Sequence, residues 1–84
     1  MRELELMGTV GCHLCEVAEA VISTHTDMTK YAVYQVDIAG DDELMEQYAL
    51  TIPVLVDVLS GNSLPWPFDE SSLNVFLAGL AKPD

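Results

Sequence analysis

The two cysteines of this chain, Cys12 and Cys15, are separated by two residues, and no other cysteine accompanies them. A disulfide stabilises a fold mainly by restricting the unfolded chain, and this effect grows with the length of the closed loop. A bond between Cys12 and Cys15 would close too short a loop to add much stability. The spacing instead favours redox chemistry, in which one sulfur attacks a disulfide and the other resolves the mixed disulfide.

The position of the pair in the chain assigns these two roles. Residues 3–8 are expected to form a strand, and the apolar spacing of residues 14–23 predicts an amphipathic helix that begins at the pair. The unpaired N–H groups and the positive dipole end of a helix N-terminus stabilise a thiolate. We therefore expect Cys12 to have a lowered pKa and to act as the nucleophile. Cys15, one turn later, is expected to be the resolving thiol.

A metal site is the other chemical use of such a pair. The cysteines could supply half of a zinc or iron–sulfur site, but such sites normally need four ligands. His13 is a neighbour of the pair, whereas His25 lies near the far end of the predicted helix, well over ~10 Å away at ~1.5 Å per residue. A metal would need a second chain or glutathione as co-ligand, so the sequence predicts no metal site. Two inert buried thiols would not need this spacing at a strand–helix corner.

The remaining elements follow from local patterns. A second strand is expected at residues 31–38, and a short helix at residues 42–48 after an acidic start that suits a helix N-terminus. The apolar run of residues 53–59 predicts a strand buried on both faces. Residues 63–64 are expected to pair back as a short edge strand. Asp69 has the position of an N-cap that opens the last helix.

The resulting order is β-α-β-α-β-β-α, within a single domain of residues 1–84. It predicts an α/β (α+β) class with a mixed sheet of four strands covered by three helices. Asp57 is expected to face solvent at the hairpin. The helix positions expected to face the core are Leu14, Val17, Ala18, Val21 and Ile22, then Leu44, Met45 and Tyr48, then Leu73, Phe76, Leu77 and Leu80.

The order of elements, the CxxC that opens the first helix, and Thr51-Ile52-Pro53 at the start of the third strand together resemble the thioredoxin fold. The small size is similar to the glutaredoxin branch, and most of all to its small bacterial glutaredoxin-like members. The resemblance implies a thiol–disulfide oxidoreductase that reduces or exchanges disulfides of protein or peptide substrates through Cys12 and Cys15. The alternative is a non-catalytic module that senses redox state or binds a protein.

The resemblance also implies a substrate-binding segment at Ile52 and Pro53. In this fold the proline of such a motif follows a cis bond and packs beside the cysteine pair, which would leave the Ile52 backbone N–H and C=O free for an extended substrate. A trans proline that simply starts a strand is the alternative. His13 stands where glutaredoxins commonly carry proline. A charged His13 would favour the Cys12 thiolate, whereas a solvated neutral one would have no influence.

The segment Trp66-Pro67-Phe68-Asp69 departs from the Gly-Gly-x-Asp that holds glutathione in glutaredoxins. Trp66 and Phe68 are candidates for an apolar docking rim or for core packing. Asp69 could stand near the former glutathione site, although its N-cap role already explains it.

The charge of the chain limits its partners. Fourteen acidic residues oppose only Arg2, Lys30 and Lys82, which gives a formal charge of −11. Such a charge repels nucleic acid and anionic membranes, so neither is an expected partner.

Glutathione is the co-substrate that the resemblance suggests, but glutathione is anionic and no cation has an obvious route to the pair. We therefore expect weak glutathione binding, no bound cofactor, and protein or peptide thiols as the natural partners. The absence of a signal-peptide pattern and of a disulfide framework predicts a cytoplasmic protein, and we expect a monomer.

Overall fold

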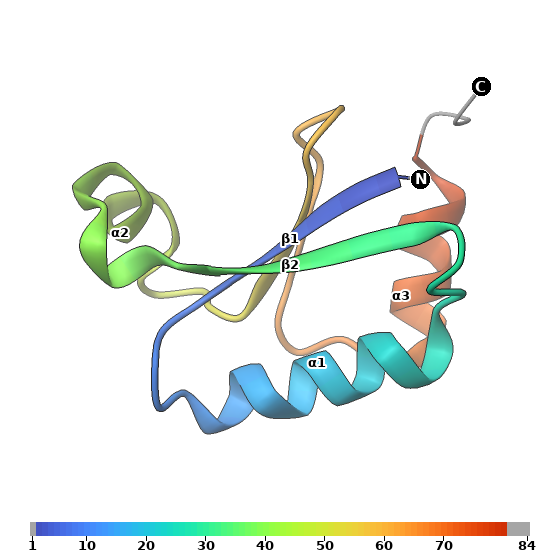
Figure 1. The fold of residues 1–84 in the computed structure, drawn as a ribbon, viewed down its shortest axis with the longest axis horizontal. Coiled ribbons are helices and arrows are strands. Elements are labelled where there is room, and N and C mark those ends of the chain that lie inside the picture. The colour runs from blue at the N-terminus through green and yellow to red at the C-terminus, as the bar shows by residue number, and fades with distance from the viewer. Residues whose placement is uncertain (1, 81–84) are drawn as a thin grey trace.

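The computed structural model describes residues 2–80 and confirms the predicted order of elements (Figure 1). The strands and helices are β1 (Arg2–Gly8), α1 (His13–His25), β2 (Tyr31–Asp37), α2 (Asp42–Tyr48), β3 (Val54–Asp57), β4 (Ser63–Pro65) and α3 (Glu70–Ala78). A 3₁₀ turn, Ile38–Gly40, joins β2 to α2, where the sequence pattern indicated a longer strand. The predicted α/β class, with a four-stranded mixed sheet and three helices, is therefore confirmed.

The sheet has the order β2-β1-β3-β4, with β1 near its centre. β1 runs parallel to β2 and antiparallel to β3, and β4 closes an antiparallel hairpin with β3. The parallel pairing of β1 and β2 requires a crossover connection, which α1 supplies. This topology brings the C-terminal end of β1, the start of α1 and the end of β2 to one edge of the molecule.

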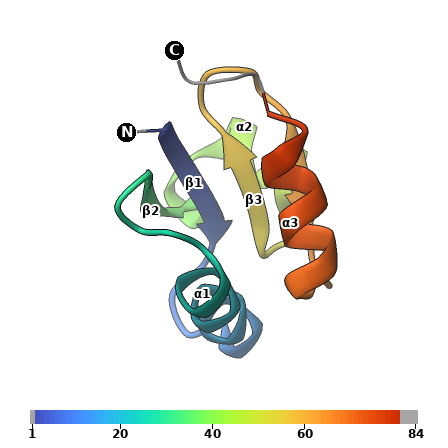
Figure 2. The ribbon, with the colours of Figure 1, turned by 90° about the vertical axis from the view of Figure 1, so that its right-hand side faces the viewer.

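Both faces of the sheet are packed, by different helices. On one face, apolar side chains of β1 and β3 pack with Ala18 and Ile22 of α1 and Leu73 of α3. On the other face, the buried cluster contains Met7 and Ile38, with partly buried side chains of α2 against it. Figure 2 shows α1 and α3 in the foreground and α2 beyond the strands. All four residues of β3 are buried, as predicted for this strand, but the strand is shorter than the predicted range 53–59, and Val58 and Leu59 are exposed.

Three side chains predicted to face the core are exposed instead. Leu14 and Val17 of α1 are 47% and 36% exposed, and Met45 of α2 is 37% exposed. α1 packs on the sheet through Ala18 and Ile22, whereas Leu14 and Val17 belong to neither buried cluster. Apolar periodicity located the helix, but it did not show how far along its length the helix would be covered.

The prediction that Asp57 faces solvent is also wrong, because this residue is fully buried. Its two carboxylate oxygens accept hydrogen bonds from Arg2, from Nε at 2.8 Å and from the terminal nitrogen Nη2 at 2.7 Å. The backbone N–H and the hydroxyl of Ser60 also donate to it. The Arg2 hydrogen bonds, helped by those from Ser60, hold the pKa of Asp57 well below its ordinary value. This ion pair joins the start of β1 to the end of β3.

Candidate redox site

A short turn carries the chain from β1 to the cysteine pair. Gly11 has a φ of +79°, a left-handed conformation that glycine adopts without steric penalty. The N–H of Cys12 donates to the carbonyl oxygen of Thr9 at 3.3 Å, which closes the turn. Cys12 is the N-cap of α1, and the helix begins at His13. The expectation that the pair opens the first helix is therefore met.

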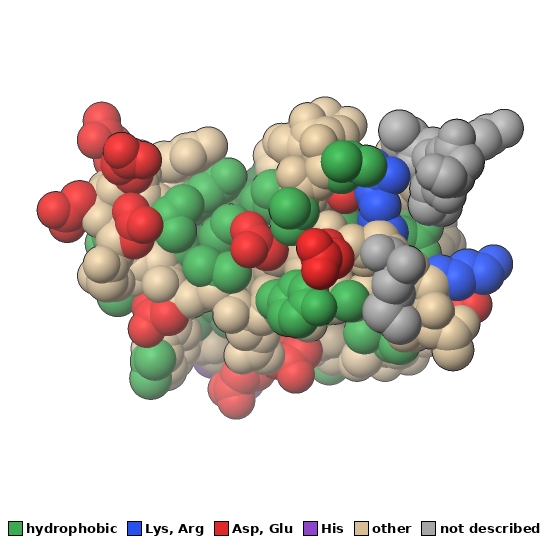
Figure 3. All heavy atoms as spheres, turned by 45° about the horizontal axis from the view of Figure 1, so that its top comes forward, with side chains coloured by type: hydrophobic (Ala, Val, Ile, Leu, Met, Phe, Trp, Pro, Cys, Tyr) green, Lys and Arg blue, Asp and Glu red, His purple; other side chains and the backbone are tan. Residues whose placement is uncertain are grey.

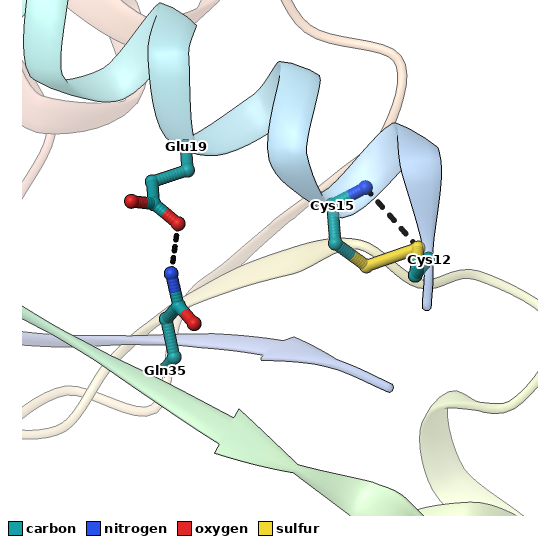
Figure 4. Close-up of a disulfide and its surroundings, with 4 residues drawn as sticks. All are labelled: Cys12, Cys15, Glu19 and Gln35. Carbon is teal, nitrogen blue, oxygen red and sulfur yellow. Dashed lines mark hydrogen bonds between the residues drawn. A yellow bond between two sulfur atoms is a disulfide. The ribbon is translucent and has the colours of Figure 1, made fainter. Parts of the chain in front are cut away.

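The sulfurs of Cys12 and Cys15 form a disulfide at the N-terminus of α1 (Figure 4). The two Cα atoms are 5.2 Å apart, a separation that suits a disulfide. The backbone N–H of Cys15 donates to Sγ of Cys12 at 3.1 Å. This N–H is one of the helix donors that have no partner within the helix, so it would stabilise negative charge on the Cys12 sulfur.

Gly8, the last residue of β1, lies directly against Cys15. A Cβ atom added at Gly8 would stand 2.6 Å from Sγ of Cys15, closer than such atoms approach in real proteins. The absence of a side chain at Gly8 therefore allows the Cys15 sulfur to sit against the end of the strand. From the sequence, Gly8 could be recognised only as the end of a strand, because the residues around it in the chain do not indicate which atoms will pack against it.

A cavity of about 470 Å³ opens beside the disulfide. Its walls are the end of β1, the turn that carries the pair, the first turns of α1 and the end of β2. Both cysteines line it, together with three acidic side chains, Glu16, Glu19 and Asp37. Sequence reasoning did not identify these acids as part of the site, although Glu16 and Glu19 lie off the apolar stripe of the helix.

Gln35 of β2 also lines this cavity and contacts α1 across it. Its side-chain amide donates a hydrogen bond to the carboxylate of Glu19 (Figure 4). The parallel pairing of β1 with β2 sets Asp37 opposite Gly8. The strand register, which no local pattern specifies, thus brings the acidic end of β2 to the disulfide.

Ile52 and Pro53 lie directly before β3, the strand that pairs with β1 on the side away from β2. Pro53 is buried and its bond to Ile52 is cis, the geometry that the resemblance implies. Met7 pairs with Val54, so one further step of this register sets Pro53 beside Gly8. The expectation of a free Ile52 N–H is wrong, however, because this group donates to the Tyr48 carbonyl oxygen at 3.1 Å.

The four other predicted substrate-binding positions differ in their surroundings. Phe68 is 5% exposed and belongs to the main core, which supports the core-packing interpretation for this ring. Trp66 is half-buried and stacks edge-on against Phe68, with ring centroids 5.0 Å apart. His13 is exposed and does not line the cavity.

Asp69 is the N-cap of α3, as the sequence predicts. Its carboxylate accepts the backbone N–H of Ser72 at 2.9 Å, and the Ser72 hydroxyl accepts the Asp69 N–H at 2.8 Å. The hydrogen bond from the Ser72 backbone N–H is the main cause that lowers the pKa of Asp69, and the hydrogen bond from the Ser72 side chain is the second. Its carboxylate therefore already has a hydrogen-bond partner at the N-terminus of α3.

Two other features are absent from the part of the chain that the structure describes. Within residues 2–80, no group of three or more His, Cys, Asp or Glu side chains is arranged to hold a metal ion. In the same range, no helix is both long enough and apolar enough to span a membrane.

Comparison with known proteins places the chain in a family. Residues 3–78 match the family described as Glutaredoxin-like domain (DUF836). The X-ray structure of the structural-genomics target protein XcR50 from X. campestris is similar, with a TM-score of 0.80 and 33% identity over 93% of this chain and 99% of that one. The solution structure of protein Ne2328 from Nitrosomonas europaea has a TM-score of 0.75 and 27% identity over 89% of each chain. No curated protein matched significantly. With its family match, its thioredoxin-like fold and its cysteine pair at the start of α1, the chain belongs to the glutaredoxin-like family.

Proposed function

We propose that this protein is a thiol–disulfide oxidoreductase that reduces or exchanges disulfides of protein or peptide substrates through Cys12 and Cys15. The observation that carries the proposal is the disulfide between these residues at the N-terminus of α1, on the wall of a cavity. Half-buried sulfurs that border a cavity are accessible to a substrate, whereas fully buried structural cysteines are inert.

The reaction needs two exchange steps. In the reduced protein the Cys12 thiolate attacks one sulfur of the substrate disulfide, and the other substrate sulfur leaves as a thiolate and takes a proton from water. Cys15 then loses its proton and attacks Sγ of Cys12, which forms the Cys12–Cys15 disulfide and releases the second substrate thiolate. The substrate gains two electrons and the protein loses two. A thiol or dithiol reductant returns them before the next cycle.

The different environments of the sulfurs support these roles. Cys12 is the N-cap and accepts the Cys15 N–H, whereas the Cys15 sulfur sits against Gly8. We therefore expect reduced Cys12 to alkylate much faster than Cys15 at neutral pH. A Cys15→Ser variant should accumulate a mixed disulfide on Cys12, and a Cys12→Ser variant should be inactive. Equal alkylation rates, or a mixed disulfide trapped on Cys15, would contradict the assignment.

We further propose that glutathione is a poor co-substrate. Among residues 2–80, no lysine or arginine lines the cavity, whereas three carboxylates do, and the Asp69 carboxylate caps α3. The anionic tripeptide would therefore meet like charge and few specific contacts. A glutathione titration should show weak binding and slow glutathione-dependent turnover. Saturation at micromolar glutathione that does not depend on salt would contradict this part of the proposal.

The decisive experiment is repeated turnover of a peptide–glutathione mixed disulfide and of a protein disulfide. Each is tested with glutathione and with a thioredoxin-reductase system as the electron donor. Many turnovers per protein molecule, with either donor, support an oxidoreductase, and we expect the protein disulfide to be the better substrate. A single exchange of electrons without turnover would support a redox-sensing module instead. The proposal places the protein in a reducing, cytoplasmic compartment, where the dithiol form would be regenerated.

A further inference from the structure

The cavity beside the disulfide carries charge of one sign. Glu16, Glu19 and Asp37 line it, and none of the described residues that line it is a lysine, arginine or histidine. Its volume of about 470 Å³ lies within the range of small-molecule and side-chain pockets, about 300–1,000 Å³. A group that approaches the sulfurs through this cavity therefore meets three carboxylates close to the reacting atoms.

These carboxylates come from two elements that the fold brings together. Glu16 and Glu19 lie in the first two turns of α1, directly after the cysteine pair, and Asp37 ends β2 opposite Gly8. Glu19 is held toward β2 by the hydrogen bond from Gln35, so its charge has a defined position beside Cys15 (Figure 4). Asp37 is also fixed, because its carboxylate accepts the N–H of Ala39 at 2.9 Å.

The described cations lie at the opposite end of the sheet. The carbonyl oxygen of Lys30 accepts the Arg2 N–H at 2.9 Å, which sets both residues at the start of β1, whereas the disulfide lies at its end. The six residue steps along β1 correspond to about 20 Å, well beyond a screening length of about 8 Å at physiological salt. Figure 3 shows the Lys and Arg side chains at one end of this face of the molecule, whereas acidic side chains lie at the other end and also across the middle. Lys82 lies outside the described residues. Among residues 2–80, therefore, no cation neutralises the cavity.

We propose that this cavity selects disulfide substrates in which a lysine or arginine side chain lies next to the reacting cysteine. The inference rests on the proposed function and names the substrate class of the same site. A basic side chain that enters between α1 and the end of β2 would pair with Glu16, Glu19 and Asp37 while the adjacent substrate sulfur meets Cys12. The three carboxylates act as specificity-determining groups and take no part in the exchange of sulfurs.

The test uses three peptides that share one intramolecular disulfide and differ in a single flanking residue, which is lysine, glutamine or glutamate. The rate of the first electron transfer from the fully reduced protein is measured with each peptide at low and high salt. We expect the lysine peptide to react about tenfold faster than the glutamate peptide at low salt, and this ratio to shrink at high salt. The ratio of two rates on one protein cancels any effect of the carboxylates on the reactivity of Cys12 itself.

Charge-neutralising variants locate the source of the preference. Glu16→Gln should lower the lysine-to-glutamate ratio about threefold, and Glu16→Gln combined with Glu19→Gln and Asp37→Asn should bring it close to one. The matched control is Glu3→Gln, which removes the same charge from an exposed side chain near the start of β1 and should leave the ratio unchanged.

Each outcome decides the inference. If the glutamine peptide is reduced but the wild-type ratio is near one, the proposed function stands and the selection of basic substrates is overturned. A loss of preference in Glu3→Gln as large as that in Glu16→Gln would assign the effect to net charge and would also overturn the role of the cavity. If the wild-type protein reduces none of the peptides, both the proposed function and the inference fail.

Discussion

Single residues around the cysteine pair determine how the two sulfurs are held. Gly8 belongs to a strand, yet its contact is with Cys15, one loop and one helical turn later in the chain. Asp57 and Arg2 are far apart in the sequence and form a buried ion pair. In both cases the sequence shows the residue type, and the partner becomes evident only when the sheet is assembled.

Replacing Gly8 should weaken the disulfide. In Gly8→Ala the new Cβ would stand 2.6 Å from Sγ of Cys15, so the closed disulfide must shift, whereas a reduced Cys15 side chain is free to rotate away. Overpacking typically costs about 1–3 kcal/mol, so the equilibrium constant for disulfide closure should fall by about tenfold or more. The oxidised fraction is measured by alkylation after equilibration in dithiothreitol redox buffers.

The control for this experiment is Gly40→Ala. A Cβ added at Gly40 meets no atom within 4 Å, and this residue also lies in a tight segment of backbone, the 3₁₀ turn. It should leave the redox equilibrium unchanged. An unchanged equilibrium in Gly8→Ala as well would show that Gly8 does not position Cys15.

The Arg2–Asp57 pair should make a large contribution to stability. Asp57→Asn removes the carboxylate that accepts two hydrogen bonds from Arg2 in a buried position. Breaking a buried ion pair at one partner typically costs about 3–5 kcal/mol, so the free energy of unfolding in urea should fall by that order. Asp42→Asn, at an exposed residue with no side-chain hydrogen bond among the described contacts, should change it little. Equal effects of the two variants would contradict the assignment.

The same carboxyl predicts how stability changes in acid. The pKa of Asp57 is lowered in the folded protein from an ordinary value of 3.8, so its contribution is fully present above that pH and is lost as the pH falls through the lowered value. The wild-type protein should therefore lose stability below about pH 4 more steeply than Asp57→Asn. Urea unfolding followed by circular dichroism from pH 2 to pH 7 measures this difference. If the free energies of unfolding of the two proteins fell in parallel below pH 4, the prediction would be refuted.

At the scale of elements, α1 has two different halves. From Ala18 onward the helix is anchored, because Ala18 and Ile22 pack in the main core and His25 lies 3.4 Å from a carboxylate oxygen of Glu70 in α3. Its N-terminal half carries the disulfide above the acidic cavity. The helix can therefore be anchored by one half while the other half presents the sulfurs to a substrate.

The start of α3 provides a test of the role of Asp69. Asp69→Ala removes the N-cap hydrogen bond to Ser72, and loss of such a cap should lower Tm by about 4–8 °C. Asp69→Asn keeps a good capping side chain and should remain close to wild type. Differential scanning calorimetry gives both values. If Asp69 contacted substrate instead, both variants would slow peptide reduction while the folded protein is stable, and we expect neither to do so.

At the scale of the whole molecule, charge is distributed unevenly. The formal charge is −11, and both described cations lie at the end of the sheet away from the disulfide. Three carboxylates line the cavity beside the disulfide, so this end of the protein carries negative charge that neither described cation is near enough to neutralise. Self-repulsion of this kind destabilises the compact state and is screened by salt.

The protein should consequently become more stable as salt is added at neutral pH. Raising NaCl from about 0.02 M to 0.5 M is expected to raise Tm by several degrees, because screening reduces the repulsion among the carboxylates. A variant with Glu3→Gln, Glu43→Gln and Glu46→Gln carries less repulsion and should respond less to salt. A Tm that is independent of salt in the wild type, measured by calorimetry, would contradict this explanation.

The sequence by itself determined the order of the elements, the helix that starts at Cys12, the buried strand β3 and the cap at Asp69. These features depend on local physics: the period of apolar residues, the preference of Asp for an N-cap, and the spacing of two thiols within one helical turn. The exposure of Leu14 and Met45 could not be predicted in this way, because a periodic pattern shows which face of a helix is apolar but not which part of that face other elements cover.

Only the tertiary structure decided what surrounds the sulfurs. The contact of Gly8 with Cys15, the acidic end of β2 beside the disulfide and the burial of Asp57 all depend on strand register and on how α1 crosses the sheet. The donation of the Ile52 N–H to Tyr48 likewise follows from the turn that ends α2. Such contacts join residues that are distant in the chain, and local propensity carries no information about them. Redox chemistry of the pair can therefore be predicted from two cysteines, whereas the substrate preference that we propose depends on side chains that only the fold brings together.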